Sequence, residues 1–173
     1  MLNLFFYHLY IDMEILHLEY DNLYDTLFDL LEKSTLKKRY RDNNRREFPN
    51  YRGGIFGLVR PRFHYKGYKE LSCDSKRLPE VYEEIIKIGK IICPFEFTSI
   101  QLNKNLVCPK HKDSNNVGLS LLVSFGDYKG GEINIDNKKY DAKCRPIIFD
   151  GSKLEHYNND IIEGTKYSLV YFK

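Results

Sequence analysis

Tryptophan is absent from this chain of 173 residues, and methionine occurs only twice. No apolar run approaches the ~20 residues that a membrane-spanning helix needs, so we expect a soluble protein with no membrane partner. Hydrophobic residues still make up 42% of the chain and aromatic residues 14%, which excludes extended disorder. Because no break in composition divides the chain, the sequence predicts one domain over residues 1–173.

Cysteine is also scarce, and no CxxC pair occurs. This excludes a zinc site built from cysteine pairs and favours a reduced, intracellular protein, although an even number of cysteines leaves disulfides open. The apolar opening MLNLFFYHLYI lacks a basic region and a small-residue cleavage site. We therefore expect no signal peptide and a cytoplasmic or nuclear location. The four cysteines are Cys73, Cys93, Cys108 and Cys144.

Positive charge exceeds negative charge only slightly, at a net +3. It is concentrated in one short stretch, which suggests contact with nucleic acid. A solvated helix end followed by a loop is the commoner origin of such a run, and the sequence leaves both interpretations open. The stretch contains Lys37, Lys38, Arg39, Arg41, Arg45 and Arg46.

The N-terminal half, residues 1–94, reads as a helical support region that includes the first strands. Leucines at helical spacing predict an amphipathic helix from Glu14 to about Lys38. Residues 41–54 carry Asn, Pro and paired Gly and read as a loop, before an extended segment that begins at Ile55. A second helix is predicted from Pro79 to Ile92, with proline at an early position.

Residues 95–173 differ, because short β-rich runs alternate with turns rich in Gly, Asn and Asp. The fold class is therefore α+β, mainly β, with a β-sandwich or jelly roll buttressed by the N-terminal helices. The predicted strands are FEFTSIQL, GLSLLVSFG, GEINID, PIIFD and TKYSLVYF.

A candidate metal site begins with His111 and Asp113, which point to one side of an extended backbone. Alone, this HxD pair is weak, since such pairs are usually solvated loops. His156, in a polar turn before the last strand, supplies a third ligand. Two imidazoles and one carboxylate leave positions open, which suits an Fe(II) that binds a chelating cosubstrate and O2. A closed zinc site with Cys108 as fourth ligand is the alternative.

Lys166 and Ser168 at the start of the last strand share one side of it. If that side faces the barrel interior, Lys166 needs an anionic partner. The distal carboxylate of a dicarboxylic acid such as 2-oxoglutarate would provide one, with a hydrogen bond from Ser168. A strand-edge lysine in water is the competing interpretation.

The order HxD, distal His and basic residue on the last strand resembles the Fe(II)/2-oxoglutarate dioxygenases. Within that superfamily the segments look most like the branch of the TET and JBP nucleobase oxygenases. One departure is Lys166, where many members carry Arg; Lys is familiar there from collagen-type prolyl 4-hydroxylases. The segments are FTSIQLNKN, HKDSNN, LVSFGDYKGGEI, IIFDGSKLEH and GTKYSLVYF.

The resemblance implies a double-stranded β-helix core of the jelly-roll or cupin-like kind. It also implies His111, Asp113 and His156 as iron ligands and Lys166 as the partner of 2-oxoglutarate. The reaction would convert 2-oxoglutarate to succinate and CO2 and hydroxylate a C–H bond. Asn103 and Asn105 are further candidates for contact with cosubstrate or substrate, although strand-end asparagines more often form turns.

The substrate is open at this stage. A nucleobase in nucleic acid, such as a 5-methylpyrimidine, is the leading expectation, supported by the basic stretch and by nearby aromatics that could stack a base. A peptidyl, prolyl-type hydroxylase is the alternative, motivated by Lys166 and the small size of the chain. A third reading is a catalytically silent β-barrel binding module. The aromatic group comprises Phe63, His64, Tyr65 and Tyr68.

Overall fold

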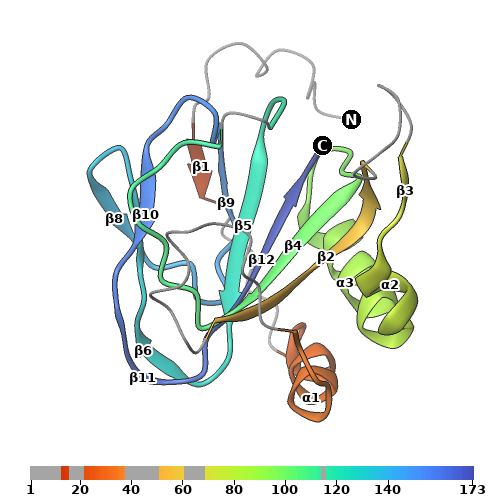
Figure 1. The fold of residues 1–173 in the computed structure, drawn as a ribbon. Coiled ribbons are helices and arrows are strands. Elements are labelled where there is room, and N and C mark those ends of the chain that lie inside the picture. Colours follow the sequence, from red (N-terminus) through yellow and green to blue (C-terminus); the bar gives the residue numbers. More distant parts are fainter. Residues whose placement is uncertain (1–12, 16–21, 38–50, 61–68, 114–115) are drawn as a thin grey trace, which may run out of the picture.

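The computed structural model describes residues 13–15, 22–37, 51–60, 69–113 and 116–173 (Figure 1). The largest sheet has seven strands in the order β1-β9-β5-β12-β4-β2-β3. All its pairings are antiparallel. These strands are β1 (Met13–Ile15), β2 (Arg52–Val59), β3 (Glu70–Leu71), β4 (Ser99–Lys104), β5 (Ser120–Phe125), β9 (Ile147–Phe149) and β12 (Tyr167–Phe172).

Short strands form a second layer, in which β10 (His156–Asn158) and β8 (Lys138–Tyr140) flank β7 (Ile133–Ile135). A separate pair joins β6 (Tyr128–Gly130) to β11 (Ile161–Gly164). Figure 1 shows these strands on one side of the large sheet and the helices on the other. The helices are α1 (Asp25–Lys33), α2 (Cys73–Arg77) and α3 (Pro79–Ile92).

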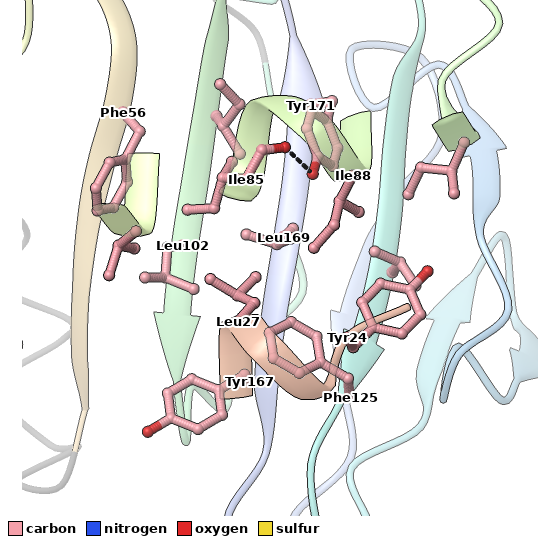
Figure 2. Packing of buried hydrophobic residues seen from close by; sticks show 14 of the residues in the cluster. Tyr24, Leu27, Phe56, Ile85, Ile88, Leu102, Phe125, Tyr167, Leu169 and Tyr171 are labelled. Carbon is pink, nitrogen blue, oxygen red and sulfur yellow. Dashed lines mark hydrogen bonds between the residues drawn. The ribbon is translucent and has the colours of Figure 1, made fainter. Parts of the chain in front are cut away.

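Alternation along β12 divides the interior into two cores. Tyr167, Leu169 and Tyr171 are fully buried and pack with α1 and α3 (Figure 2). The Tyr171 hydroxyl donates to the carbonyl of Ile85 in α3 at 2.9 Å, which ties the helix to the sheet. The opposite face of β12 contributes Val170 to the second core. That second core lies between the two β layers and positions the site described below.

The predicted fold class is confirmed, since the chain is mainly β with antiparallel sheets in a jelly roll and a few helices. The second predicted helix is confirmed with its bounds, as α3. Each of the five strands predicted after Pro94 overlaps an observed strand, and these are β4, β5, β7, β9 and β12. The assignment of residues 1–173 to a single domain stays a prediction. Within the described residues, no helix is both long and apolar enough to cross a bilayer.

The helix predicted from Glu14 is wrong at its start, because Met13–Ile15 forms β1 and pairs with β9 at the edge of the large sheet. The helix that exists is α1, which begins at Asp25 after a turn at Asn22 with φ +68°. The apolar residues of the predicted segment have helical spacing, but in β1 the backbone N–H and C=O groups find their hydrogen-bond partners in β9.

The predicted loop over residues 41–54 is wrong at its end, because β2 already begins at Arg52. Gly53 belongs to the strand because it pairs with Asn103 of β4, and a Cβ there would lie 2.5 Å from the Leu102 carbonyl oxygen. The short strands β6, β8 and β10 begin within segments rich in Gly, Asn and Asp that were predicted as turns. His156 therefore begins a strand and does not lie in a turn.

Candidate metal centre

Backbone pairing brings the three predicted ligands together from distant parts of the chain. His111 and His156 form an isolated antiparallel bridge, with N–H to O distances of 3.0 and 2.9 Å. The N–H of Asp113 donates to the carbonyl of Gly151, between β9 and β10, at 2.8 Å. Main-chain hydrogen bonds thus fix the backbone position of each of the three predicted ligands.

The side chains converge as the HxD interpretation predicts. His111 Nε2 lies 3.5 Å from Asp113 Oδ1, and His156 Nε2 lies 3.6 Å from Asp113 Oδ2. One donor atom from each residue lies within 4.8 Å of the others. Ligands about 2.1 Å from one metal and at right angles are about 3 Å apart, so a small shift would complete three metal bonds. The donor set fits Fe(II) and leaves other coordination positions open.

Backbone carbonyls orient both imidazoles. His111 Nδ1 lies 2.7 Å from the carbonyl oxygen of Pro109, and His156 Nδ1 lies 3.0 Å from that of Leu154. A carbonyl only accepts, so Nδ1 carries the proton in each ring and Nε2 faces Asp113 as the metal donor. The sequence contains no signal for these contacts, because any residue can supply a carbonyl.

The electrostatics of the cluster favour a cation between the three groups. Burial alone would raise the pKa of the Asp113 carboxyl, but hydrogen bonds from His111 and His156 outweigh it and hold this pKa well below its ordinary range. The hydrogen bond to Asp113 in turn raises the pKa of His111 to about 10. Asp113 is therefore ionised, and a divalent metal would displace a proton from an imidazole.

Cys108 lies beside this cluster but outside it. Its Sγ is 3.5 Å from Nδ1 and 3.7 Å from Nε2 of His111, so the thiol lies against the ring and not beside Asp113. The converging set of donors contains three residues and does not include Cys108. The alternative of a closed zinc site therefore lacks its fourth ligand in this arrangement.

Lys166 is a buried cation, with only 4% of the residue exposed. Its Nζ donates to the carbonyl of Gly131 and lies 5.7 Å from the centre of the Tyr128 ring. Within the described part of the chain it forms no ion pair with a carboxylate. Burial lowers the pKa of Lys166 to about 8, although Glu132 and Asp141 partly oppose this. The barrel thus holds an ammonium group without a close counter-ion.

Ser168 and Asn103 lie side by side on paired strands, where the Asn103 amide donates to Ser168 Oγ at 3.2 Å. Tyr51 Oη and Gln101 Nε2, each 3.1 Å away, both donate to Asn103 Oδ1. Neither Tyr51 nor Gln101 was among the predicted site residues. Tyr51 precedes the neighbouring strand β2, and the spacing along β4 cannot reveal such a partner, whereas Gln101 lies on β4 itself, two residues before Asn103.

Asn105 has a different role from the one expected for Asn103. Its Oδ1 accepts from the N–H of Lys166 at 2.9 Å, and its own N–H donates to the Lys166 carbonyl at 2.8 Å. A φ of +53° places it in a turn conformation. Asn105 therefore fixes the backbone of Lys166, in agreement with the turn-forming alternative.

The predicted nucleic-acid segment lies almost wholly outside the described residues. Within it, Lys37 is described and exposed. The residues outside the description are Lys38, Arg39, Arg41, Arg45 and Arg46, together with the aromatic group Phe63, His64, Tyr65 and Tyr68.

No protein-family profile matches the chain, and no curated protein matches it. Among solved structures, it is similar to a 2OG-Fe(II) oxygenase family oxidoreductase from Burkholderia pseudomallei, with a TM-score of 0.60 and 14% identity over 94% of this chain and 84% of that one. It is also similar to NgTET1 in complex with 5mC DNA, with a TM-score of 0.56 and 15% identity over 86% of this chain and 67% of that one. A third similar structure is the viral collagen prolyl hydroxylase of Paramecium Bursaria Chlorella virus-1 in a 2OG complex, with a TM-score of 0.53 and 16% identity over 93% of this chain and 94% of that one. The chain therefore has the fold of the 2OG-Fe(II) oxygenases.

Proposed function

We propose that this chain is a non-haem Fe(II)- and 2-oxoglutarate-dependent dioxygenase that hydroxylates a C–H bond of a macromolecular substrate. The main support is that the cluster of three donor side chains and the buried ammonium of Lys166, which has no ion-pair partner among the described residues, both border the second core. Phe149 and Val170 belong to the same core, and the Phe149 ring packs against His156 at 5.0 Å. Val170 lies on the side of β12 that also carries Ser168 and Lys166.

Each group has one role in this proposal. His111, Asp113 and His156 would hold Fe(II), which with 2-oxoglutarate and O2 supplies the oxidative chemistry. Lys166 would pair with the distal carboxylate of 2-oxoglutarate, which gives the buried ammonium its missing counter-charge. The apolar second core keeps bulk water away from the reacting groups.

The leading substrate within this proposal is a nucleobase in nucleic acid. The likeness to NgTET1 in complex with 5mC DNA supports it. A peptidyl hydroxylase remains the second candidate. It is favoured by Lys166 and by the likeness to a Pseudomonas putida prolyl-4-hydroxylase, with a TM-score of 0.54 at 10% identity. Peptide pools followed by mass spectrometry test it, and no hydroxylated product from any pool would argue against it.

The first test is succinate production by anaerobically reconstituted protein given Fe(II), 2-oxoglutarate and O2. We expect a metal-dependent signal in the wild type that is lost in His111→Ala and Asp113→Ala. Lys112→Ala is the matched control, because Lys112 lies between the two ligands but is exposed. It should keep the wild-type rate.

A thermal measurement separates an enzyme from a silent binding module. Fe(II) and 2-oxoglutarate together should raise the melting temperature of the wild type, because both bind the folded state. His111→Ala should melt normally but lose the response. If the wild type shows no succinate production and no thermal shift, the proposed function is refuted.

A further inference from the structure

A cavity of about 860 Å³ opens between the large sheet and the start of α2, and its described lining includes none of the three donor residues of the metal cluster. Its walls come from the end of β2, the start of β4, the end of β12 and the segment after the HxD motif. Pockets of this size commonly hold small molecules or single groups of a polymer. The lining includes three cationic and three large apolar residues, namely Arg60, Lys69, Lys173, Leu58, Val117 and Phe172.

The cavity lies at the metal end of the barrel. Ser99 of β4 lines it and pairs with Phe172 of β12, which lines it too. Asn116, also in the lining, places its Nδ2 3.5 Å from Asp113 Oδ2 and 3.4 Å from Ser120 Oγ. A group bound in the cavity would thus be one side chain away from a metal ligand.

Three cations surround the cavity. Arg60 follows β2, Lys69 precedes β3 and Lys173 follows β12, and all three residues are exposed. The one acidic residue among the described lining is Asp74, which is 5% exposed. Asp74 is already neutralised, since it pairs with Arg77 at 3.2 Å and accepts from the N–H of Ile55. The described lining of the cavity therefore carries a net positive charge.

The existing contacts of these cations are weak enough to be exchanged. Lys173 pairs with Glu96 at 3.0 Å, but the two side chains are 51% and 89% exposed. An exposed pair of this kind contributes little to stability. Lys69 Nζ donates to Thr98 Oγ1 at 3.2 Å, which leaves two of its three protons for another acceptor.

Apolar surface lies between the cations. Leu58 and Val117 are 39% and 77% exposed, and Phe172 is a further apolar residue of the lining. Cations around an apolar slot match a nucleotide, which joins an anionic phosphate to a flat base. A neutral peptide would bring no negative charge to the three cations.

We infer that this cavity binds a nucleotide of a single-stranded nucleic acid, with Arg60, Lys69 and Lys173 on its phosphates and the base against Leu58 and Val117. A single strand exposes its bases without the cost of unpairing a duplex. The inference rests on the proposed function, for which it names the substrate class and the surface that recognises it.

Fluorescence anisotropy of metal-free protein with a single-stranded DNA oligonucleotide of about 12 nucleotides tests the binding directly. Three phosphate contacts give a salt slope of about −2, so a fourfold rise in salt should weaken binding about 20-fold. In the triple variant Arg60→Gln, Lys69→Gln, Lys173→Gln the slope should fall to near zero, and low-salt binding should weaken at least tenfold. The matched control changes Lys87, Lys90 and Lys129 to Gln, all exposed and outside this cavity.

Several outcomes would overturn the inference. These are a wild type that does not bind the DNA, a triple variant with unchanged salt slope, an equal loss in the control, and a neutral peptide that competes for the cavity better than the DNA. Heparin, which carries charge without bases, should compete poorly; equal competition would also overturn it. The anisotropy assay needs no iron. A protein that binds the DNA but shows neither succinate production nor a thermal shift would therefore refute the proposed function and leave the binding inference standing.

Discussion

Gly151 lies so close to Asp113 that a side chain would not fit without movement. A Cβ at Gly151 would lie 3.1 Å from Asp113 Oδ2 and 3.5 Å from His156 Cε1. The Gly151 carbonyl also accepts the hydrogen bond from the N–H of Asp113. Gly151 therefore sets both the position of the carboxylate and the space beside it.

Gly151→Ala should weaken metal binding with the fold retained, since the carboxylate must shift by a few tenths of an ångström. We expect a 10- to 100-fold rise in the Kd for Fe(II) or Co(II), the range typical of changes behind metal ligands. Anaerobic titration followed by absorption of Co(II) measures it. Gly118→Asn is the control, because a Cβ at Gly118 meets nothing within 4 Å and asparagine tolerates its φ of +81°. Equal Kd values for Gly151→Ala and wild type would contradict this role.

The convergence of three donor side chains could be predicted because it is encoded by residue type and order. A His and an Asp two positions apart, and a second His after an apolar strand, are visible in one sequence. The backbone carbonyls that orient the imidazoles, at Pro109 and Leu154, are not visible there. The same holds for Gly151, whose importance depends on a residue 38 positions away in the chain.

The fold could be predicted where local signals were strong. The prediction was incomplete where pairing between distant segments determines the secondary structure. Proline near the start of α3 and the apolar period of that helix gave its bounds. By contrast, β1 forms because Met13–Ile15 pairs with β9, and Gly53 joins β2 because β4 approaches it closely. A local pattern cannot reveal such partners.

Gly89 in α3 should be intolerant of substitution, although alanine favours helix more than glycine does. A Cβ there would lie 2.5 Å from Tyr171 Cε1 and 2.6 Å from Phe97 Cζ, both in the core behind the sheet. Gly89→Ala should therefore lower the free energy of unfolding by about 1–3 kcal/mol through overpacking. Urea denaturation measures it, with Ile91→Ala on the exposed side of α3 as control. A more stable Gly89→Ala protein would show that α3 moves outward without cost.

Lys166→Met should stabilise the protein in the absence of 2-oxoglutarate. Burial lowers the pKa of Lys166 from its ordinary 10.5 to about 8, which corresponds to about 3 kcal/mol against the charged form at neutral pH. Since the folded pKa lies below the unfolded one, the wild type gains stability as pH rises from about 8 to about 10.5. The advantage of the variant should therefore be largest at pH 7 and shrink towards pH 10.

Thermal melts at these pH values measure the effect, with Lys129→Met as control because that lysine side chain is 73% exposed. The Lys166→Met protein should also lose the thermal response to 2-oxoglutarate. A variant less stable than the wild type at pH 7 would mean that the bond to the Gly131 carbonyl outweighs the cost of burial.

The affinity of the metal-loaded protein for 2-oxoglutarate should fall above pH 8. Only the ammonium form of Lys166 attracts a carboxylate, and burial places its pKa at about 8 before the dicarboxylate binds. Above that pH the free protein must take up a proton on binding, so the Kd should rise towards tenfold per pH unit. The neighbouring Tyr128 does not interfere, since burial raises its pKa to about 12, and the hydrogen bond from Lys139 holds the pKa of Glu132 well below this range. Lys166→Arg should give a flat profile, because guanidinium does not titrate in this range. Isothermal titration of both proteins from pH 7 to 9.5 with an inert divalent metal compares them, and parallel profiles would place the pH-sensitive group elsewhere and remove Lys166 from the cosubstrate site.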